Sequence, residues 1–217
     1  MSRESLASKK HRATQVCERM ALHYPDAKAS LDYWGDGFKF AIAVMLSAQT
    51  TDAGVNKVTC KLWEKYPRVF DLAQANVVDV EEILRPIGFY KVKSKNCIEM
   101  SRIIVSEYGG ELPSCEQDLL RLPGVGRKTV NVVMNEVYGI ANGIAVDTHV
   151  FRIAHKLNFS AQDTPDKVER DLLKIIDPES WKDVNKRWVF FGREFCIARR
   201  PKCDICFLLD ICPALKS

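Results

Sequence analysis

The sequence predicts an all-α fold. Apolar residues recur at helical spacing in several stretches, and residues 148–157 show the pattern most clearly. The apolar positions there are Val150, Ile153, Ala154 and Leu157. No stretch alternates between apolar and polar residues for long enough to predict a strand, and no Asn-Gly or Asp-Gly turn joins two such stretches. Both observations favour helices joined by short connections.

The expected helices follow one another along most of the chain. Asp52 is the predicted N-cap of one helix, and Gly109 and Gly139 are predicted to end two others. The residues from Ile140 to Gly143 form a candidate domain boundary. The predicted helical ranges are 52–66, 91–108, 128–137, 148–157, 165–175 and 181–195.

Size and composition indicate a globular protein with a substantial core. The chain has 217 residues, of which 47% are hydrophobic and 28% are charged. No apolar run approaches the roughly 18 residues that predict a membrane span. The polar, basic N-terminus lacks the apolar segment of a secretory signal. We therefore expect a cytoplasmic protein.

The charge is unevenly distributed, although the formal net charge is only +4. Basic residues outnumber acidic ones in segments 1–12, 85–102 and 181–217. The second of these includes Lys91 and Lys93. Basic patches on a nearly balanced protein fit a surface that binds a polyanion. The alternative is that these residues lie on ordinary solvated helix faces.

Four of the eight cysteines are packed into one short C-terminal segment. They are Cys196, Cys203, Cys206 and Cys212. Iron–sulfur clusters are commonly held by four cysteine thiolates, whereas structural zinc usually takes two Cys-x-x-Cys pairs that are farther apart. Here one Cys-x-x-Cys pair lies between two single cysteines, which favours a [4Fe–4S] cluster over zinc.

The other four cysteines are scattered along the chain. They are Cys17, Cys60, Cys97 and Cys115. In an intracellular protein such residues are most simply buried free thiols. We therefore expect no role for them in metal binding.

Three cations lie between the first two cysteines of the C-terminal segment, namely Arg199, Arg200 and Lys202. A loop fixed at both ends by metal ligands would present these charges to phosphate groups. Alternatively, the cations offset the negative charge of a thiolate-bound cluster. Both roles are compatible. Because the cysteine segment is a small part of a larger helical chain, a ferredoxin that only transfers electrons is disfavoured.

A second informative segment runs from Leu122 to Thr129 and contains Gly124, Val125 and Gly126. An apolar stretch, 118–122, leads into the glycines, and a new helix is predicted directly after them. Backbone N–H groups of a tight turn and of a helix N-terminus can bind a phosphate together. The alternative is an ordinary corner between two helices.

Lys128 lies in the first turn of one predicted helix, and Asp147 directly precedes another. The positive end of the helix dipole disfavours a second positive charge on Lys128, and a neutral lysine is a nucleophile that can form a Schiff base. Asp147 is a natural N-cap, and a carboxylate there can also stabilise positive charge on a sugar carbon. A surface lysine and a purely structural cap are the alternatives.

These elements occur in a characteristic order. Segment 46–52 comes first, then 122–129, then 146–150, and finally the four cysteines. The ordered set closely resembles the endonuclease III family of the helix–hairpin–helix DNA glycosylase superfamily, from about residue 15 onward. Each motif alone is modestly specific, whereas their combination is highly specific.

The resemblance implies a two-lobed all-α fold that binds DNA between its lobes. A six-helix barrel would span 30–140 and contain the helix–hairpin–helix at about 118–138. The second lobe would join 1–29 to 141–217 and hold the [4Fe–4S] cluster. The implied partner is damaged double-stranded DNA, bound by a monomer that associates with the nucleoid.

The resemblance also implies roles for individual residues. Lys128 and Asp147 match the catalytic lysine and aspartate of the family. Gln49 matches a residue that fills the gap left by a flipped nucleotide. Phe89 stands at the place of an intercalating residue that is usually aliphatic, so its aromatic ring is a departure from the family pattern.

The activity implied is that of a bifunctional DNA glycosylase and AP lyase. It would excise oxidised pyrimidines such as thymine glycol and nick abasic sites by β-elimination. One alternative is a monofunctional mismatch or uracil glycosylase, which generally lacks a lysine at position 128. The other is a non-catalytic helix–hairpin–helix module, against which the combination of Lys128 with Asp147 argues.

Overall fold

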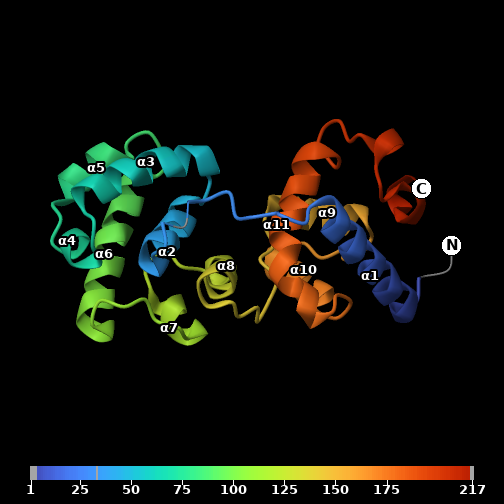
Figure 1. Ribbon diagram of the computed structural model, residues 1–217, viewed down its shortest axis with the longest axis horizontal. Coiled ribbons are helices and arrows are strands. Elements are labelled where there is room, and N and C mark those ends of the chain that lie inside the picture. Colours follow the sequence, from blue (N-terminus) through green and yellow to red (C-terminus); the bar gives the residue numbers. More distant parts are fainter. Residues whose placement is uncertain (1–3, 33, 216–217) are drawn as a thin grey trace. The chain divides into compact units, whose positions relative to one another are not determined.

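The computed structural model describes residues 4–32 and 34–215, and within these ranges it contains helices and no strand (Figure 1). The predicted all-α class is therefore confirmed. The chain divides into two compact units. We call Ala29–Tyr138 the central unit, and the described residues up to Lys28 together with those from Gly139 onward the terminal unit.

The described residues of the central unit form seven helices. They are α2 (Gly37–Leu46), α3 (Asp52–Lys65), α4 (Val69–Ala73), α5 (Val77–Leu84), α6 (Tyr90–Tyr108), α7 (Glu116–Arg121) and α8 (Arg127–Tyr138). Helix α6 packs against both α4 and α5, and α2 packs against α8. Nearly every residue of α2 is buried, as expected for a helix that is apolar on all sides. Its N-cap, Asp36, accepts hydrogen bonds from the amides of Phe38 and Lys39.

The terminal unit combines the start and the end of the chain. Its helices are α1 (Leu6–His23), α9 (Thr148–Lys156), α10 (Pro165–Leu172) and α11 (Pro178–Glu194). Three short 3₁₀ turns follow, namely η1 (Cys203–Ile205), η2 (Leu209–Ile211) and η3 (Pro213–Leu215). Helix α11 packs on α1 and α9, and Trp188 is among the largest side chains buried between them.

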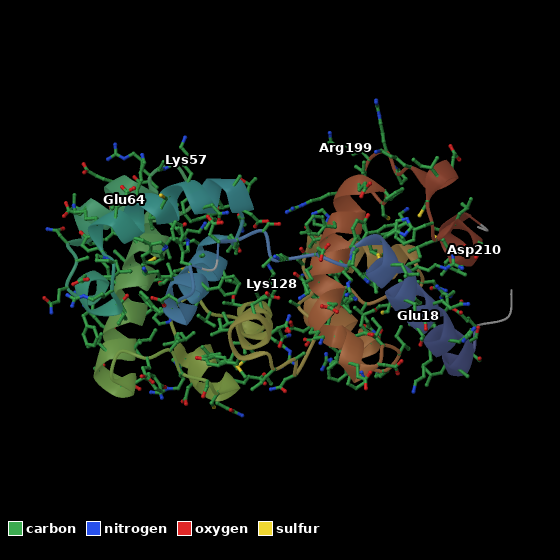
Figure 2. The ribbon with its side chains drawn as sticks, in the orientation of Figure 1. Glu18, Lys57, Glu64, Lys128, Arg199 and Asp210 are labelled. Carbon is green, nitrogen blue, oxygen red and sulfur yellow. The ribbon has the colours of Figure 1, made fainter. Side chains whose placement is uncertain are left out.

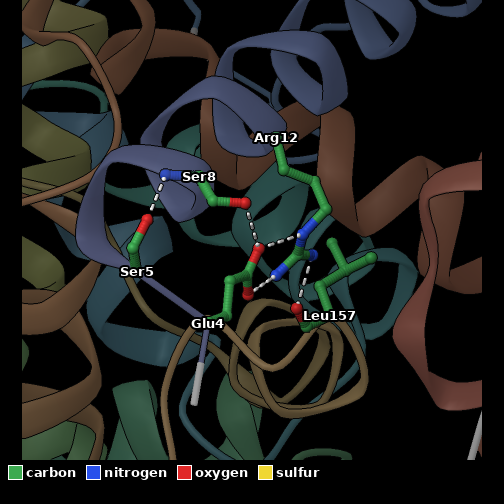
Figure 3. Close-up of polar contacts among 5 residues, drawn as sticks. All are labelled: Glu4, Ser5, Ser8, Arg12 and Leu157. Carbon is green, nitrogen blue, oxygen red and sulfur yellow. Dashed lines mark hydrogen bonds and ion pairs between the residues drawn. The ribbon is translucent and has the colours of Figure 1, made fainter. Parts of the chain in front are cut away.

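Polar contacts fasten α1 to the end of α9. The Arg12 guanidinium donates to the carbonyl oxygen of Leu157 at 2.7 Å and to both carboxylate oxygens of Glu4 (Figure 3). It also lies 4.6 Å from the centroid of the Phe159 ring. These contacts satisfy a carbonyl at the C-terminal end of α9, where helices leave acceptors without intrahelical partners.

Several predicted helix limits were wrong by a few residues. Thr51, and not Asp52, is the N-cap of α3, because the Thr51 hydroxyl accepts from the amide of Gly54 at 3.2 Å. Helix α10 ends at Leu172 and α11 begins at Pro178, where proline suits the first helical turn. The apolar stretch before the hairpin, 118–122, lies mostly in the short helix α7, as a helix–hairpin–helix at about 118–138 requires, although α7 begins at Glu116. Gly109 and Gly139 do follow helix ends, with φ of 62° and 69°.

Two expectations about side-chain burial were also wrong. Cys60 and Cys115 are exposed, so only part of the scattered set is buried. Lys93 is 5% exposed and belongs to the interior of the central unit, not to a basic surface. None of the described helices is both long and apolar enough to span a membrane.

The ion pair between Glu4 and Arg12 should make the free energy of unfolding depend on pH. The hydrogen bonds from Arg12 hold the pKa of Glu4 below its ordinary value. Because the folded-state pKa is the lower one, the pair stabilises the fold above the ordinary glutamate pKa, and this stabilisation is lost as the pH falls through the folded-state value. Glu4→Gln should lower the free energy of unfolding by about 1 kcal/mol at pH 7.

Urea unfolding at a series of pH values checks this prediction. The difference between the wild type and Glu4→Gln should shrink below pH ~4. Glu82→Gln changes an exposed carboxylate on α5 in the same way, and we expect an effect within about 0.5 kcal/mol. A difference for Glu4→Gln that stayed constant across this range would contradict the role of the ion pair.

Candidate functional site

The segment from Leu122 to Gly126 forms a tight turn between α7 and α8. The Val125 amide donates to the Leu122 carbonyl at 3.1 Å, and the Val130 amide donates to the Gly126 carbonyl at 3.0 Å. Gly124 has a φ of +76°. A Cβ atom on Gly124 would lie 2.8 Å from Asn96 Nδ2 and 2.9 Å from Met45 Cγ, so only glycine fits between α2 and α6.

Gly126 differs from Gly124 in its surroundings. No heavy atom outside its immediate neighbours would lie within 4 Å of a Cβ placed on Gly126. The turn is therefore packed on the side of Gly124 and open on the side of Gly126, directly before the N-terminus of α8. Open space at exposed helix N–H groups suits the approach of an anion.

Lys128 is the second residue of α8 and is exposed (Figure 2). Within the described part of the chain, no carboxylate forms an ion pair with its ammonium group. The adjacent Arg127 is instead paired with Glu116 at 3.4 Å. The Lys128 side chain is therefore accessible beside the open part of the turn.

Asp147 is the N-cap of α9, as predicted. Its Oδ1 atom accepts hydrogen bonds from the amides of His149 and Val150 at 2.9 and 2.8 Å. Both bonds go to the same oxygen, so among the described residues none is directed at Oδ2. Asp147 can therefore cap the helix with one oxygen and keep the other for chemistry.

Close packing supports the helix that starts at Asp147. A Cβ on Gly192 of α11 would lie 2.6 Å from His149 Nδ1 and 2.9 Å from Arg152 Nη2, so glycine is needed where the two helices meet. The Arg152 guanidinium donates to the carbonyl oxygens of Gly192 and Cys196. Arg152 was not identified from the sequence, because nothing in its local pattern shows which carbonyls it will reach.

Gln49 and Phe89 lie in two neighbouring turns of the central unit. Both are exposed and both have left-handed backbone conformations, with φ of 54° and 57°. A Cβ on Gly88 would lie 3.9 Å from the Gln49 carbonyl oxygen, which places the two turns beside each other. The exposed Phe89 ring, at 66% relative accessibility, is free to contact another molecule.

Lys93 lies directly beneath these turns. Its ammonium group donates to the Ala48 carbonyl and to the Thr50 hydroxyl, each at 2.8 Å. The sequence did contain a signal for its burial, because Lys93 falls on the same helical stripe as Cys97, Met100 and Ile104, which are all fully buried.

The four clustered cysteines follow the end of α11 and are all partly buried. Burial raises the pKa of the Cys196 thiol, although the positive charge of Arg152 opposes this effect. Cys196, Cys206 and Cys212 also pack against the apolar core of the terminal unit.

The donor set fits an iron–sulfur cluster. Across residues 4–32 and 34–215, no three His, Cys, Asp or Glu side chains converge as ligands of a single ion. In a [4Fe–4S] cluster each cysteine binds a different iron atom, so the four sulfurs stand farther apart than around one zinc ion. The cysteine loop supplies one thiolate for each of the four iron atoms.

Neighbouring side chains hold the cysteine loop against α1. Arg19 donates to the Phe207 carbonyl and to the Asp210 carboxylate, each at 2.8 Å. The His23 and Phe207 rings stack with their centroids 3.7 Å apart. The Lys202 amide donates to the Phe195 carbonyl at 2.8 Å, which closes the loop between the first two cysteines.

The three cations of that loop are Arg199, Arg200 and Lys202, and all three are exposed. Figure 2 labels Arg199. The structure thus keeps them available to an external anion. Lys128 and the hairpin belong to the central unit, whereas Asp147 and the cysteine loop belong to the terminal unit.

Family models match two parts of the chain. Residues 42–178 match the HhH-GPD superfamily of base excision DNA repair proteins, and residues 196–212 match the iron–sulfur binding domain of endonuclease III. Endonuclease III of Synechocystis sp. is 41% identical over 98% of this chain and 96% of its own length. The chain belongs to the endonuclease III family.

Other relatives agree with this assignment. Endonuclease III of Escherichia coli K12 is 36% identical over 94% of this chain and 95% of its own length. A trapped endonuclease III–DNA covalent intermediate superposes with a TM-score of 0.89 at 41% identity, covering 95% of this chain and 97% of that one. A thermostable thymine-DNA glycosylase shares the fold, with a TM-score of 0.82 at 20% identity.

Membership of the endonuclease III family establishes the class of activity. The chain is a DNA glycosylase and AP lyase of base excision repair, and it carries a [4Fe–4S] cluster. As a member of this family it acts on DNA. The predicted fold family, enzyme class and cofactor are therefore confirmed.

We predict that the clustered cysteines hold the iron–sulfur cluster and that the scattered cysteines do not. Cys203→Ser should abolish it, because serine replaces a soft thiolate ligand by a hard hydroxyl. Visible charge-transfer absorbance and bound iron per chain measure the loss. Cys115→Ser alters an exposed cysteine outside the loop and should keep full iron content. Equal iron in both variants would show that Cys203 is not a ligand.

Proposed function

We propose that the enzyme excises oxidised pyrimidines, such as thymine glycol, from damaged double-stranded DNA with Lys128 as its nucleophile and Asp147 as its catalytic carboxylate. The observation that carries this proposal is the position of Lys128. It is an exposed lysine that pairs with no carboxylate of the described residues, and it lies two residues after Gly126, on the open side of the hairpin.

The damaged nucleotide must first leave the base stack, because its C1′ atom is inaccessible inside a duplex. Lesions that already weaken stacking or pairing make this step easier. Gln49 and Phe89 are proposed to occupy the space that the nucleotide leaves. Both are exposed and project from adjacent turns, as residues that enter a duplex must.

Lys128 then attacks C1′ with its neutral Nζ atom. The bond from Nζ to C1′ forms as the bond from C1′ to the base nitrogen breaks, and the base leaves with that electron pair and takes up a proton. The sugar ring then opens as the bond between C1′ and O4′ breaks, O4′ takes up a proton lost from Nζ, and a Schiff base forms between Nζ and C1′. The Schiff base acidifies the C2′ protons, and loss of one expels the 3′ phosphate by β-elimination.

Asp147 has two tasks in this scheme. Its carboxylate stabilises the positive charge that develops at C1′ while the base departs. It also accepts a proton from the Lys128 ammonium and passes it to the departing base, so that the carboxylate is ionised again as positive charge develops at C1′. The Oδ2 atom is available for both tasks, since the bonds that cap α9 use Oδ1.

The hairpin at Gly124, Val125 and Gly126 and the side chains of the cysteine loop are proposed to hold DNA phosphates. Because the Val125 amide is used in its bond to the Leu122 carbonyl, the hairpin would contact phosphate through its other amides. Arg199, Arg200 and Lys202 would supply sequence-independent affinity that weakens with salt. When bound, the [4Fe–4S] cluster would fix both ends of this loop in place. We propose that the protein acts as a monomer, in the cytoplasm at the nucleoid.

Borohydride trapping tests the role of Lys128. A duplex with one thymine glycol is incubated with protein and reductant, which converts the Schiff base into a stable amine. The wild type and Lys57→Gln, which alters an exposed lysine on α3 (Figure 2), should give a covalent protein–DNA band. Lys128→Gln should give none, with strand cleavage reduced at least ~10³-fold.

The other outcomes distinguish the alternatives. Base release by the wild type without a covalent band would indicate a monofunctional glycosylase. Neither band nor base release, with DNA still bound, would exclude oxidised pyrimidines as the substrate. A band that persists in Lys128→Gln would contradict the assignment of the nucleophile.

Replacement of Asp147 separates capping from catalysis. Asparagine caps helices about as well as aspartate, so Asp147→Asn should keep the free energy of unfolding within about 0.5 kcal/mol. Its rate of base release should fall ~100-fold, because the negative charge is lost. Asp147→Ala should also lose about 1 kcal/mol of stability. Wild-type base release by Asp147→Asn would refute a catalytic role.

A further inference from the structure

Lys93 is a buried lysine with an unusual set of partners. Its side chain runs from α6 into the central unit, and its ammonium group contacts a carbonyl oxygen and a hydroxyl oxygen. No carboxylate among the described residues pairs with it. Burial lowers the pKa of Lys93, since the interior solvates a charge poorly.

A buried ammonium group is a poor means of stabilising a fold. Its desolvation is costly, and an apolar side chain of similar volume often gives equal or greater stability. The position of Lys93 on an otherwise apolar stripe with Cys97 and Met100 makes such a replacement straightforward. The role of the charge must therefore lie in what its hydrogen bonds hold.

The two bonds of the ammonium group hold both sides of Gln49. Ala48 and Thr50 flank Gln49, whose left-handed backbone is unfavourable in a residue other than glycine. Attachment at both neighbours restrains the turn in this conformation and leaves the Gln49 side chain exposed.

The backbone of Lys93 is linked to Phe89 as well, by a helical hydrogen bond that does not depend on the lysine side chain. The Lys93 amide donates to the Phe89 carbonyl at 3.0 Å, in the first turn of α6. Phe89 is itself left-handed and begins α6 without a side-chain cap. Among the described residues, four non-glycine residues have a positive φ, and Lys93 is bonded to the turns of two of them.

We propose that Lys93 is a positioning residue that holds Gln49 and Phe89 as one rigid pair for insertion into the gap left by the flipped nucleotide. This inference rests on the proposed function, since it assigns a support to the two residues proposed to enter the duplex. Rigidity matters there because residues ordered before binding lose less conformational entropy when they enter the stack. Lys93 itself does not touch the DNA.

The test uses a duplex with a tetrahydrofuran abasic analogue opposite 2-aminopurine, whose fluorescence rises when it is unstacked. The analogue has no base to release, so the measurement reports insertion separately from chemistry. Lys93→Met removes the ammonium group with little change in volume. Lys57→Met removes an exposed charge from α3 and is the matched control.

The wild type and Lys57→Met should give the same fluorescence rise at saturation. Lys93→Met should give less than half of that rise, with affinity for the analogue and single-turnover release of thymine glycol each about tenfold lower. Thr50→Val removes one of the two acceptors and should cause a smaller change in the same direction. The fluorescence rise of the double variant should be no smaller than that of Lys93→Met, because the two substitutions remove the same hydrogen bond.

A full fluorescence rise in a folded Lys93→Met would overturn the inference, even if base release were slower. Should Lys93→Met fail to fold, Thr50→Val decides the question, and a wild-type rise in that variant would refute the inference. Failure of the wild type to bind the analogue at all would instead refute the proposed function, and this inference with it.

Discussion

The unsatisfied N–H groups at the starts of helices are the constraint on which the rest of this structure depends. An all-α protein has many such ends, and each needs an acceptor or an approaching anion. Apart from the cations of the cysteine loop, the residues proposed to act on DNA lie at these ends. Gln49 comes just before α3, Phe89 before α6, Gly126 before α8 and Asp147 before α9. The proposed functional residues therefore lie near helix N-termini, and the apolar residues within the helices form the two cores.

Different ends are satisfied in different ways, and the differences match the proposed roles. Thr51 and Asp147 cap their helices with side-chain oxygens. Phe89 provides no side-chain cap and adopts a left-handed conformation. Its carbonyl accepts a hydrogen bond from the Lys93 amide. The start of α8 is open beside Gly126, so an external phosphate can take the place of a cap there.

The two units contribute complementary parts. The central unit supplies Lys128, the hairpin and the pair Gln49 and Phe89. The terminal unit supplies Asp147 and the cysteine loop with its cations. Arg152 connects these last two features, because it lies one turn after the start of α9 and donates to the carbonyl of the first cluster cysteine, Cys196. Loss of the cluster would therefore disturb the support of α9 as well as the loop.

Features that depend on neighbouring residues in the chain were predictable from the sequence. The cap at Asp147, the glycine that ends α6 and the four-cysteine segment are of this kind. One-residue errors arose where two good caps adjoin, as at Thr51 and Asp52, because only the hydrogen bond to Gly54 distinguishes them.

Features that depend on contacts between distant segments were not predicted. Lys93 was counted with the surface lysines, since its acceptors at Ala48 and Thr50 lie more than 40 residues earlier in the chain. The packing of Met45 and Asn96 against Gly124 was missed for the same reason. The helical spacing of apolar residues in α6 could have predicted that Lys93 is buried. It could not have predicted which residues accept its hydrogen bonds.

The central claim is that the atom joined to DNA during catalysis is Nζ of Lys128. Mass spectrometry of peptides from the borohydride-reduced protein–DNA complex tests it most directly, because it locates the adduct on a single residue. We predict that the modified peptide contains Lys128 and that fragmentation places the sugar remnant on its side chain. An adduct on any other lysine, or on the N-terminal amine, would contradict the claim.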